Sequence, residues 1–102
     1  MTQSNISVLA TKQGLQLKGD LVYANVSDVV KVGDELLRQH NSDNVVFSCV
    51  EINRLDSAGI SLFLEWKRLC LQLNKNCQFE GLPQQAVSLI QTYKLNNLLA
   101  LA

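Results

Sequence analysis

One short polar stretch between two apolar segments constrains this chain more than any other part of the sequence. Residues 55–60 have the sequence Leu-Asp-Ser-Ala-Gly-Ile. They follow a solidly apolar segment, residues 45–50, and they open the longest helical pattern, from about residue 57 to residue 74. An apolar run of strand length with a helical pattern a few residues later predicts a strand, a loop and a helix built as one unit.

The loop can cap the helix that follows it. Either the Asp56 carboxylate or the Ser57 hydroxyl can accept a hydrogen bond from a free N–H of the first helical turn. Gly59 lacks a side chain, so another piece of backbone can come close to that turn. The positive end of the helix dipole beside Ser57 tolerates a phosphate or an acidic group of a partner. An ordinary capped helix start with no further function explains the same residues, so both interpretations stay open here.

Composition and charge exclude several classes of protein. The chain has 102 residues, of which 47% are hydrophobic and 18% charged, so we expect one globular domain spanning residues 1–102. Nine basic residues balance nine acidic ones without a basic run, which argues against nucleic acid as a partner. The apolar runs are too short to span a bilayer, and residues 1–5 lack the features of a signal peptide. We therefore expect a cytoplasmic protein that does not insert directly into the membrane.

The sequence gives no sign of a metal site or of catalysis. The three cysteines, Cys49, Cys70 and Cys77, are odd in number and form no C-x-x-C pair. Each falls in an apolar pattern, which favours a buried, reduced thiol. His40 is the only histidine, so partners for a metal site are missing. No phosphate loop or catalytic pair is visible, so an enzyme is the weakest interpretation, and we predict no cofactor and no small-molecule ligand.

The hydropathy pattern predicts seven elements in chain order. The strands are expected at residues 6–10, 15–18, 45–50 and 77–81, and the helices at residues 25–39, 57–74 and 84–93. Asn25 or Ser27 is the expected cap of the first helix. The apolar tail, residues 95–102, is expected to pack back onto the domain.

These elements predict an α/β fold with a small mixed sheet and packed helices. The first two strands form an antiparallel hairpin, whereas the later strand–helix–strand units imply parallel pairing with right-handed crossovers. Residues 45–50 are apolar on both faces of the strand. This favours a central strand covered on both sides, or a strand in a parallel part of the sheet. We expect four or five strands, with residues 45–50 internal.

Two motifs in this order resemble those of STAS domains, the fold of bacterial anti-sigma factor antagonists and of sulfate-transporter tails. Residues 15–21, Leu-x-Leu-x-Gly-Asp-Leu, resemble the early strand of that family, which ends in Gly-acidic-Leu. Residues 56–60, Asp-Ser-Ala-Gly-Ile, resemble its Asp-hydroxyl-small-Gly-aliphatic loop before the second helix. The resemblance runs from about residue 15 to residue 95 and implies a STAS-like fold.

The departures from the family pattern separate its subfamilies. Anti-sigma factor antagonists usually carry two adjacent hydroxyls after the Asp, and their kinase phosphorylates the second. Ala58 occupies that second position here, and only Ser57 keeps a hydroxyl. This arrangement is similar to the MlaB-type STAS subunits of Mla phospholipid transporters. Val22 replaces the acidic residue that often follows Gly-acidic-Leu.

The MlaB-type resemblance implies a non-catalytic cytoplasmic subunit, held at the periphery of the inner membrane by its partner. That partner would be the ATPase subunit of an ABC transporter that moves phospholipid between the inner and outer membranes and preserves outer-membrane lipid asymmetry. The alternative is an anti-sigma factor antagonist in which Ser57 is a substitute phosphosite. Ser57 itself is expected to act as a contact and cap residue, not as a nucleophile, because nothing in the sequence supplies it with a base.

The second predicted helix carries more apolar residues than one packed face needs. Either it is sunk deeply in the core, or one of its flanks meets a partner, and the pattern does not decide which flank. We expect Trp66 on the outer flank, because tryptophan is seldom wholly buried and is enriched at interfaces. The candidate partner-binding residues are Asn53, Arg54, Asp56, Ser57, Ser61, Leu62, Glu65, Trp66 and Leu69.

Overall fold

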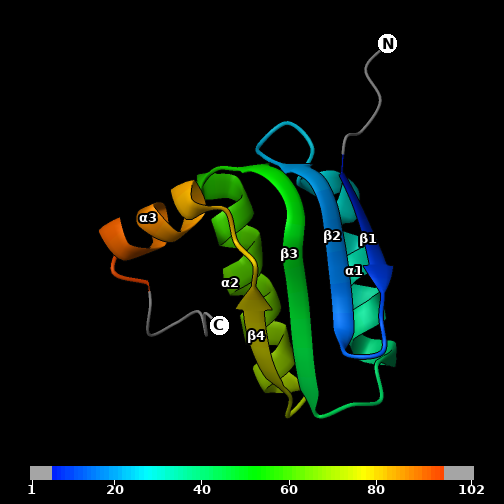
Figure 1. The fold of residues 1–102 in the computed structure, drawn as a ribbon. Coiled ribbons are helices and arrows are strands. Elements are labelled where there is room, and N and C mark those ends of the chain that lie inside the picture. The colour runs from blue at the N-terminus through cyan, green and yellow to red at the C-terminus, as the bar shows by residue number, and fades with distance from the viewer. Residues whose placement is uncertain (1–5, 96–102) are drawn as a thin grey trace.

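A computed structural model describes residues 6–95 of the chain as a four-stranded sheet with helices packed on it (Figure 1). The elements are β1 (Ile6–Ala10), β2 (Gly14–Leu21), α1 (Ser27–Gln39), β3 (Asn44–Leu55), α2 (Ser57–Gln72), β4 (Asn76–Glu80) and α3 (Gln84–Thr92). The expected order of elements is confirmed, and α2 begins at the predicted residue. The tail predicted to pack back lies, from residue 96 onward, outside the described residues.

The sheet is mixed, with strand order β1-β2-β3-β4. The β1–β2 hairpin is antiparallel, and β3 pairs in parallel with β2 on one side and with β4 on the other. The predicted internal position of residues 45–50 and their parallel pairing are therefore confirmed. The carboxyl ends of β2 and β3 meet at one edge of the sheet, where Leu21 pairs with Leu55.

The helices α1 and α2 pack on the same face of the sheet, behind the strands in Figure 1. On β3, the side chains of Val45, Phe47 and Cys49 are buried towards these helices. Val50 is 66% exposed, and the alternate residues Val46 and Ser48 are only partly buried. The expectation of a strand covered on both sides is therefore wrong. The apolar run comes instead from a parallel, internal strand that has one well-covered face.

Strand β3 continues to Leu55, beyond the predicted end at Val50. The prediction ended too early because two irregularities interrupt the alternation of buried and exposed residues in this strand. Its register with β2 shifts between residues 16 and 18 of β2, and again between residues 19 and 20. At each shift β3 contains one residue more than β2, as in a β-bulge. The bulges return Ile52 and Leu55 to the core while their neighbours stay exposed. A period of two, the usual sequence signature of a strand, is lost over this part of β3.

The first helix lacks the predicted cap. Its N-cap position is Val26, and no side chain accepts a hydrogen bond from the first turn. The Asn25 side-chain amide instead donates to the carbonyl oxygen of Asp20 at 2.9 Å. Asn25 is thus engaged in holding the end of β2, and the prediction that Asn25 or Ser27 caps α1 is wrong.

Trp66 of α2 lies at the centre of the core. Its side chain is fully buried and stacks on Phe47 of β3, with ring centroids 5.6 Å apart and an interplanar angle of 13°. The indole also covers Gly33 of α1, where an added Cβ would lie 2.2 Å from Cζ2 of the ring. Phe79 of β4 stacks on Phe47 and contacts Phe63 of α2 at a tilt of 34°, with its ring centroid 4.6 Å from those of both. One aromatic cluster therefore joins both long helices to β3 and β4.

The contact between Trp66 and Gly33 predicts that Gly33→Ala destabilises the protein by about 1 kcal/mol, and by no more than about 2 kcal/mol. Overpacking a close-packed core typically costs about 1–3 kcal/mol, and the better helix propensity of alanine recovers only about 1 kcal/mol. Urea unfolding at 25 °C measures the difference. Val32→Ala, at an exposed neighbour on α1, is the matched control and should change stability by no more than about 0.5 kcal/mol. A Gly33→Ala variant at least as stable as the wild type would contradict the packing described for Trp66.

Candidate functional site

The Asp56 side chain connects the start of α2 to the loop that follows β2. One carboxylate oxygen, Oδ1, accepts hydrogen bonds from the backbone N–H groups of Ala58 at 2.9 Å and Gly59 at 3.3 Å. The other, Oδ2, accepts from the backbone N–H of Tyr23 at 3.0 Å. Of the two predicted caps for α2, Asp56 is therefore the one used, and the expectation that Ser57 acts as a cap is wrong. Three backbone N–H groups share its carboxylate, which makes Asp56 a residue that positions its neighbours.

Gly59 permits the close approach that the sequence predicted. A Cβ at this position would lie 2.6 Å from the carbonyl oxygen of Leu21, at the end of β2. The backbone N–H of Asp56 also donates to that oxygen, at 3.4 Å. The end of β2 is thus held against the first turn of α2, and the loop after β2 lies beside the helix N-terminus.

Four exposed side chains surround this junction. Ser57 is exposed, and its hydroxyl has no hydrogen-bond partner among residues 6–95. Tyr23, whose backbone is fixed by Asp56, is 84% exposed. Asn53 and Arg54, at the end of β3, are exposed as well. These residues place a hydroxyl, an aromatic ring, an amide and a cation around the N-terminus of α2.

Tyr23 was not among the predicted site residues. A single tyrosine in a short segment between a strand and a helix carries no periodic signal in the sequence. Its position follows from a contact between segments 33 residues apart, the hydrogen bond from its N–H to Asp56. The available sequence signal was its place two residues after the Gly-Asp-Leu motif, because that motif ends the strand that meets α2.

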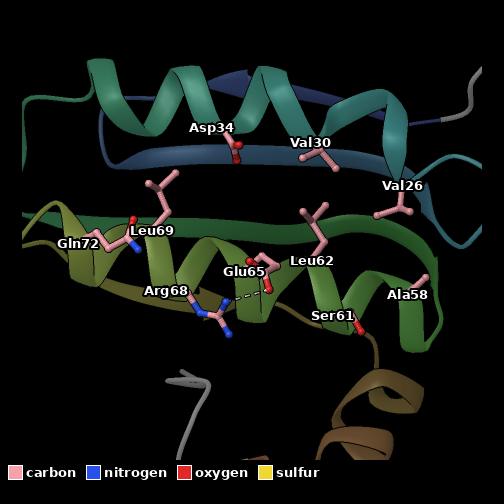
Figure 2. Close-up of a pocket in the computed structure, with 10 residues that line it drawn as sticks. All are labelled: Val26, Val30, Asp34, Ala58, Ser61, Leu62, Glu65, Arg68, Leu69 and Gln72. Atoms are coloured by element: carbon pink, nitrogen blue, oxygen red, sulfur yellow. Dashed lines mark ion pairs between the residues drawn. The ribbon is translucent and has the colours of Figure 1, made fainter.

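A groove of about 480 Å³ lies between α1 and α2 (Figure 2). Leu62 and Leu69 of α2 point towards α1, and Val26 and Val30 of α1 face them. Asp34 of α1 adds a carboxylate to this apolar lining. The remaining lining residues are Ala58, Ser61, Glu65, Arg68 and Gln72.

The polar stripe of α2 borders this groove. Ser61 and Glu65 are exposed, and Glu65 forms an ion pair with Arg68 at 3.5 Å. Both partners of this ion pair are largely exposed, so it contributes about 0.3–0.5 kcal/mol at most. Leu62 and Leu69 are buried in the single chain, but they form part of the groove lining. Of the predicted residues on α2, four therefore adjoin one groove: Ser61, Leu62, Glu65 and Leu69.

The prediction that Trp66 lies on an exposed flank is wrong, because its side chain is fully buried. Two features of α1 make this burial favourable. Gly33 leaves space for the ring, and the Asp34 carboxylate accepts the indole N–H at 3.0 Å, so no polar group is stranded. Trp66 therefore cannot contact a partner directly without leaving the core. Of the two interpretations of the apolar excess on α2, the helix sunk deeply in the core accounts for Trp66.

The cysteines belong to the core, as predicted. Cys49, Cys70 and Cys77 are free thiols and all three are buried. Burial, with a smaller effect of the Glu80 charge, raises the pKa of Cys49 to about 12. A hydrogen bond from the Cys70 thiol to Cys77 raises the pKa of Cys70 and lowers that of Cys77. Among residues 6–95, no group of three or more His, Cys, Asp or Glu side chains could hold a metal ion.

Comparison with known proteins gives the same fold. A family model described as "Mlab, STAS domain" matches residues 6–100. None of the curated proteins compared with the chain matches it. Among solved structures, that of the anti-sigma factor antagonist SpoIIAA in its unphosphorylated form is similar, with a TM-score of 0.72 and 14% sequence identity over 95% of this chain and 87% of the other. At this identity the likeness concerns the fold alone. None of the helices in the described part of the chain has the length and hydropathy needed to span a bilayer.

The hydrogen bonds of Asp56 predict that Asp56→Ala costs about 1–2 kcal/mol of stability, because the N-cap of α2 is lost. Asp56→Asn keeps an acceptor oxygen and should recover most of that loss. Ser57→Ala removes no hydrogen bond within the described residues and should stay within about 0.5 kcal/mol of the wild type. Thermal and urea unfolding of the three variants compare them. A loss for Ser57→Ala equal to that for Asp56→Ala would identify Ser57 as the cap instead.

Proposed function

The chain belongs to the STAS domain family as an MlaB-type member, and from this premise we propose that it is the non-catalytic STAS subunit of an inner-membrane ABC transporter that moves phospholipid. It binds the ATPase subunit of that transporter and supports its assembly and activity. The observation that carries the proposal is the start of α2, where Ser57 directly follows Asp56, is exposed, and precedes Ala58 in the lining of the groove. The protein is then held at the inner membrane through its partner, on the cytoplasmic side.

The proposed docking surface combines two adjoining parts. The first is the junction at the N-terminus of α2, with Tyr23, Asn53, Arg54 and Ser57. The second is the groove between α1 and α2. An apolar centre bordered by polar, exposed side chains is the usual composition of a protein interface. Tyr23 takes the role of exposed aromatic anchor that the sequence had assigned to Trp66, since tyrosine is enriched among residues that dominate binding energy.

The surroundings of Ser57 support binding in preference to catalysis. A nucleophilic serine needs a base within hydrogen-bond reach, and the hydroxyl of Ser57 has no hydrogen-bond partner in the described residues. The neighbouring carboxylate, Asp56, already accepts three backbone N–H groups. His40 bonds to the carbonyl oxygen of Thr11 and to the backbone of Ser42, in a different part of the fold.

The second candidate function is that of an anti-sigma factor antagonist controlled by phosphorylation of Ser57. The similarity in fold to SpoIIAA favours it. Ala58 weighs against it, because the position that is usually phosphorylated in that subfamily has no hydroxyl here. Affinity capture of the tagged protein from its own cells, followed by mass spectrometry, separates the two. An ABC-transporter ATPase as the main partner supports the proposal, whereas an anti-sigma factor or switch kinase would establish the alternative.

The exposure of Ser57 predicts that Ser57→Glu weakens ATPase binding at least tenfold while the domain stays folded. The added carboxylate lies at the positive end of the α2 dipole, which stabilises it in the free domain. On docking, however, that charge must be desolvated beside Asp56 without a partner, and this is unfavourable. Binding is measured by calorimetry with the purified ATPase subunit, and folding by the midpoint of thermal unfolding.

Ser88→Glu, at an exposed position in α3, is the matched control and should leave both quantities unchanged. Ser57→Glu that bound the ATPase at full strength would place Ser57 outside the interface and remove the main support for this docking surface.

A further inference from the structure

Asp34 is a carboxylate set in the apolar part of the groove. It projects from α1 towards α2, between the levels of Val30 and Leu69 (Figure 2). The side chain is partly buried, and Oδ1 accepts the indole N–H of Trp66 at 3.0 Å. Stacking on Phe47 fixes the ring of Trp66, and the hydrogen bond from its indole N–H in turn fixes the Asp34 carboxylate. Asp34 thus presents a charge in a defined position.

The groove contains no cation that neutralises Asp34. Arg68 is the one basic residue among its lining residues, and it pairs with Glu65 and points away from α1 (Figure 2). Lys31 and Arg38 lie one turn before and after Asp34 on α1, but both are exposed, and the described residues include no ion pair to Asp34. Asp34 therefore has one hydrogen bond, from a neutral donor, and keeps an uncompensated negative charge.

This charge restricts what can cover the groove. An apolar segment of a partner that covered Val30, Leu62 and Leu69 would remove water from the Asp34 carboxylate without supplying a hydrogen-bond donor or a cation. Such desolvation of an unpaired charge is strongly unfavourable. A partner that also brings a cation avoids this penalty. Arginine suits the site best, because its guanidinium carries several donors in a planar fork and is less strongly hydrated than an ammonium group. Its methylene stem can lie along the apolar lining.

We propose that the groove between α1 and α2 receives an arginine side chain of the ATPase subunit, whose guanidinium pairs with the Asp34 carboxylate. This inference rests on the proposed function, because it names the chemistry of the partner at the same docking surface. Asp34 would then determine partner specificity in addition to the residues at the start of α2. Trp66 contributes indirectly, by orienting the carboxylate through its indole N–H.

The test is Asp34→Asn, in which an amide oxygen can still accept the indole N–H while the charge is removed. Binding to the purified ATPase subunit is measured by calorimetry at 50 and 300 mM NaCl. We expect Asp34→Asn to weaken binding at least tenfold at low salt and to reduce the salt dependence of the affinity. The matched control is Glu35→Gln, which removes one negative charge from the next, exposed position of α1 and should bind within twofold of the wild type.

A second measurement does not depend on the variant. Trp66 is the only tryptophan of the chain, so its indole N–H gives one resonance in a ¹H–¹⁵N spectrum. That resonance should shift when the unlabelled ATPase subunit is added to the labelled wild type, because its acceptor gains a cationic partner. An unshifted resonance in the saturated complex would overturn the inference even if Asp34→Asn failed to fold.

The outcomes separate this inference from the function on which it rests. If Ser57→Glu loses binding while Asp34→Asn binds like the wild type, the docking surface stands and the arginine in the groove is ruled out. Equal weakening by Asp34→Asn and Glu35→Gln would show a general effect of charge and would also rule it out. If the wild type does not bind the ATPase subunit at all, the proposed function fails, and this inference fails with it.

Discussion

The packing of Trp66 between two helices and a strand is the contact on which the rest of this structure depends. The indole stacks on Phe47 of β3, covers Gly33 of α1 and donates its N–H to Asp34. These three contacts set the separation of α1 and α2, because a larger residue at position 33 would displace the ring. The groove between the helices, and the carboxylate within it, are consequences of that separation. A core residue thus shapes a surface that it does not reach.

Asp56 has a comparable role at the other end of α2. Its carboxylate caps the helix and also holds the backbone of Tyr23, so the loop after β2 and the start of α2 form one unit. Gly59 makes this possible by leaving room for the carbonyl of Leu21. Ser57 and Tyr23 are therefore presented on a rigid support. In the proposed function, the motif at residues 56–60 therefore contributes to docking through the neighbouring groups that it positions.

Much of the fold could be predicted from the sequence because the local signals agreed with one another. An apolar strand, a capped helical pattern and a terminal hairpin indicate a mixed sheet, and the structure has that sheet. The signals failed where tertiary contacts override local pattern. Two bulges hid the second half of β3 by breaking its alternation. Asn25 donates to Asp20 at the end of β2 and does not cap α1.

In the candidate site, too, some features follow from local sequence and others from tertiary contacts. The sequence by itself determined that residues 56–60 form the start of a capped helix, that Asp56 or Ser57 supplies the cap, and that one hydroxyl remains there, because these features depend on neighbours within a few residues. It also determined that α2 has more apolar surface than one face requires. Only the tertiary structure decided that Trp66 is buried, that Tyr23 is exposed beside Ser57, and that Asp34 lies in the groove. Each of these features depends on a contact between distant segments: Trp66 and Asp34 are 32 residues apart in the chain, and Tyr23 and Asp56 are 33 apart. Periodicity within a helix does not specify which residue of another segment will lie opposite.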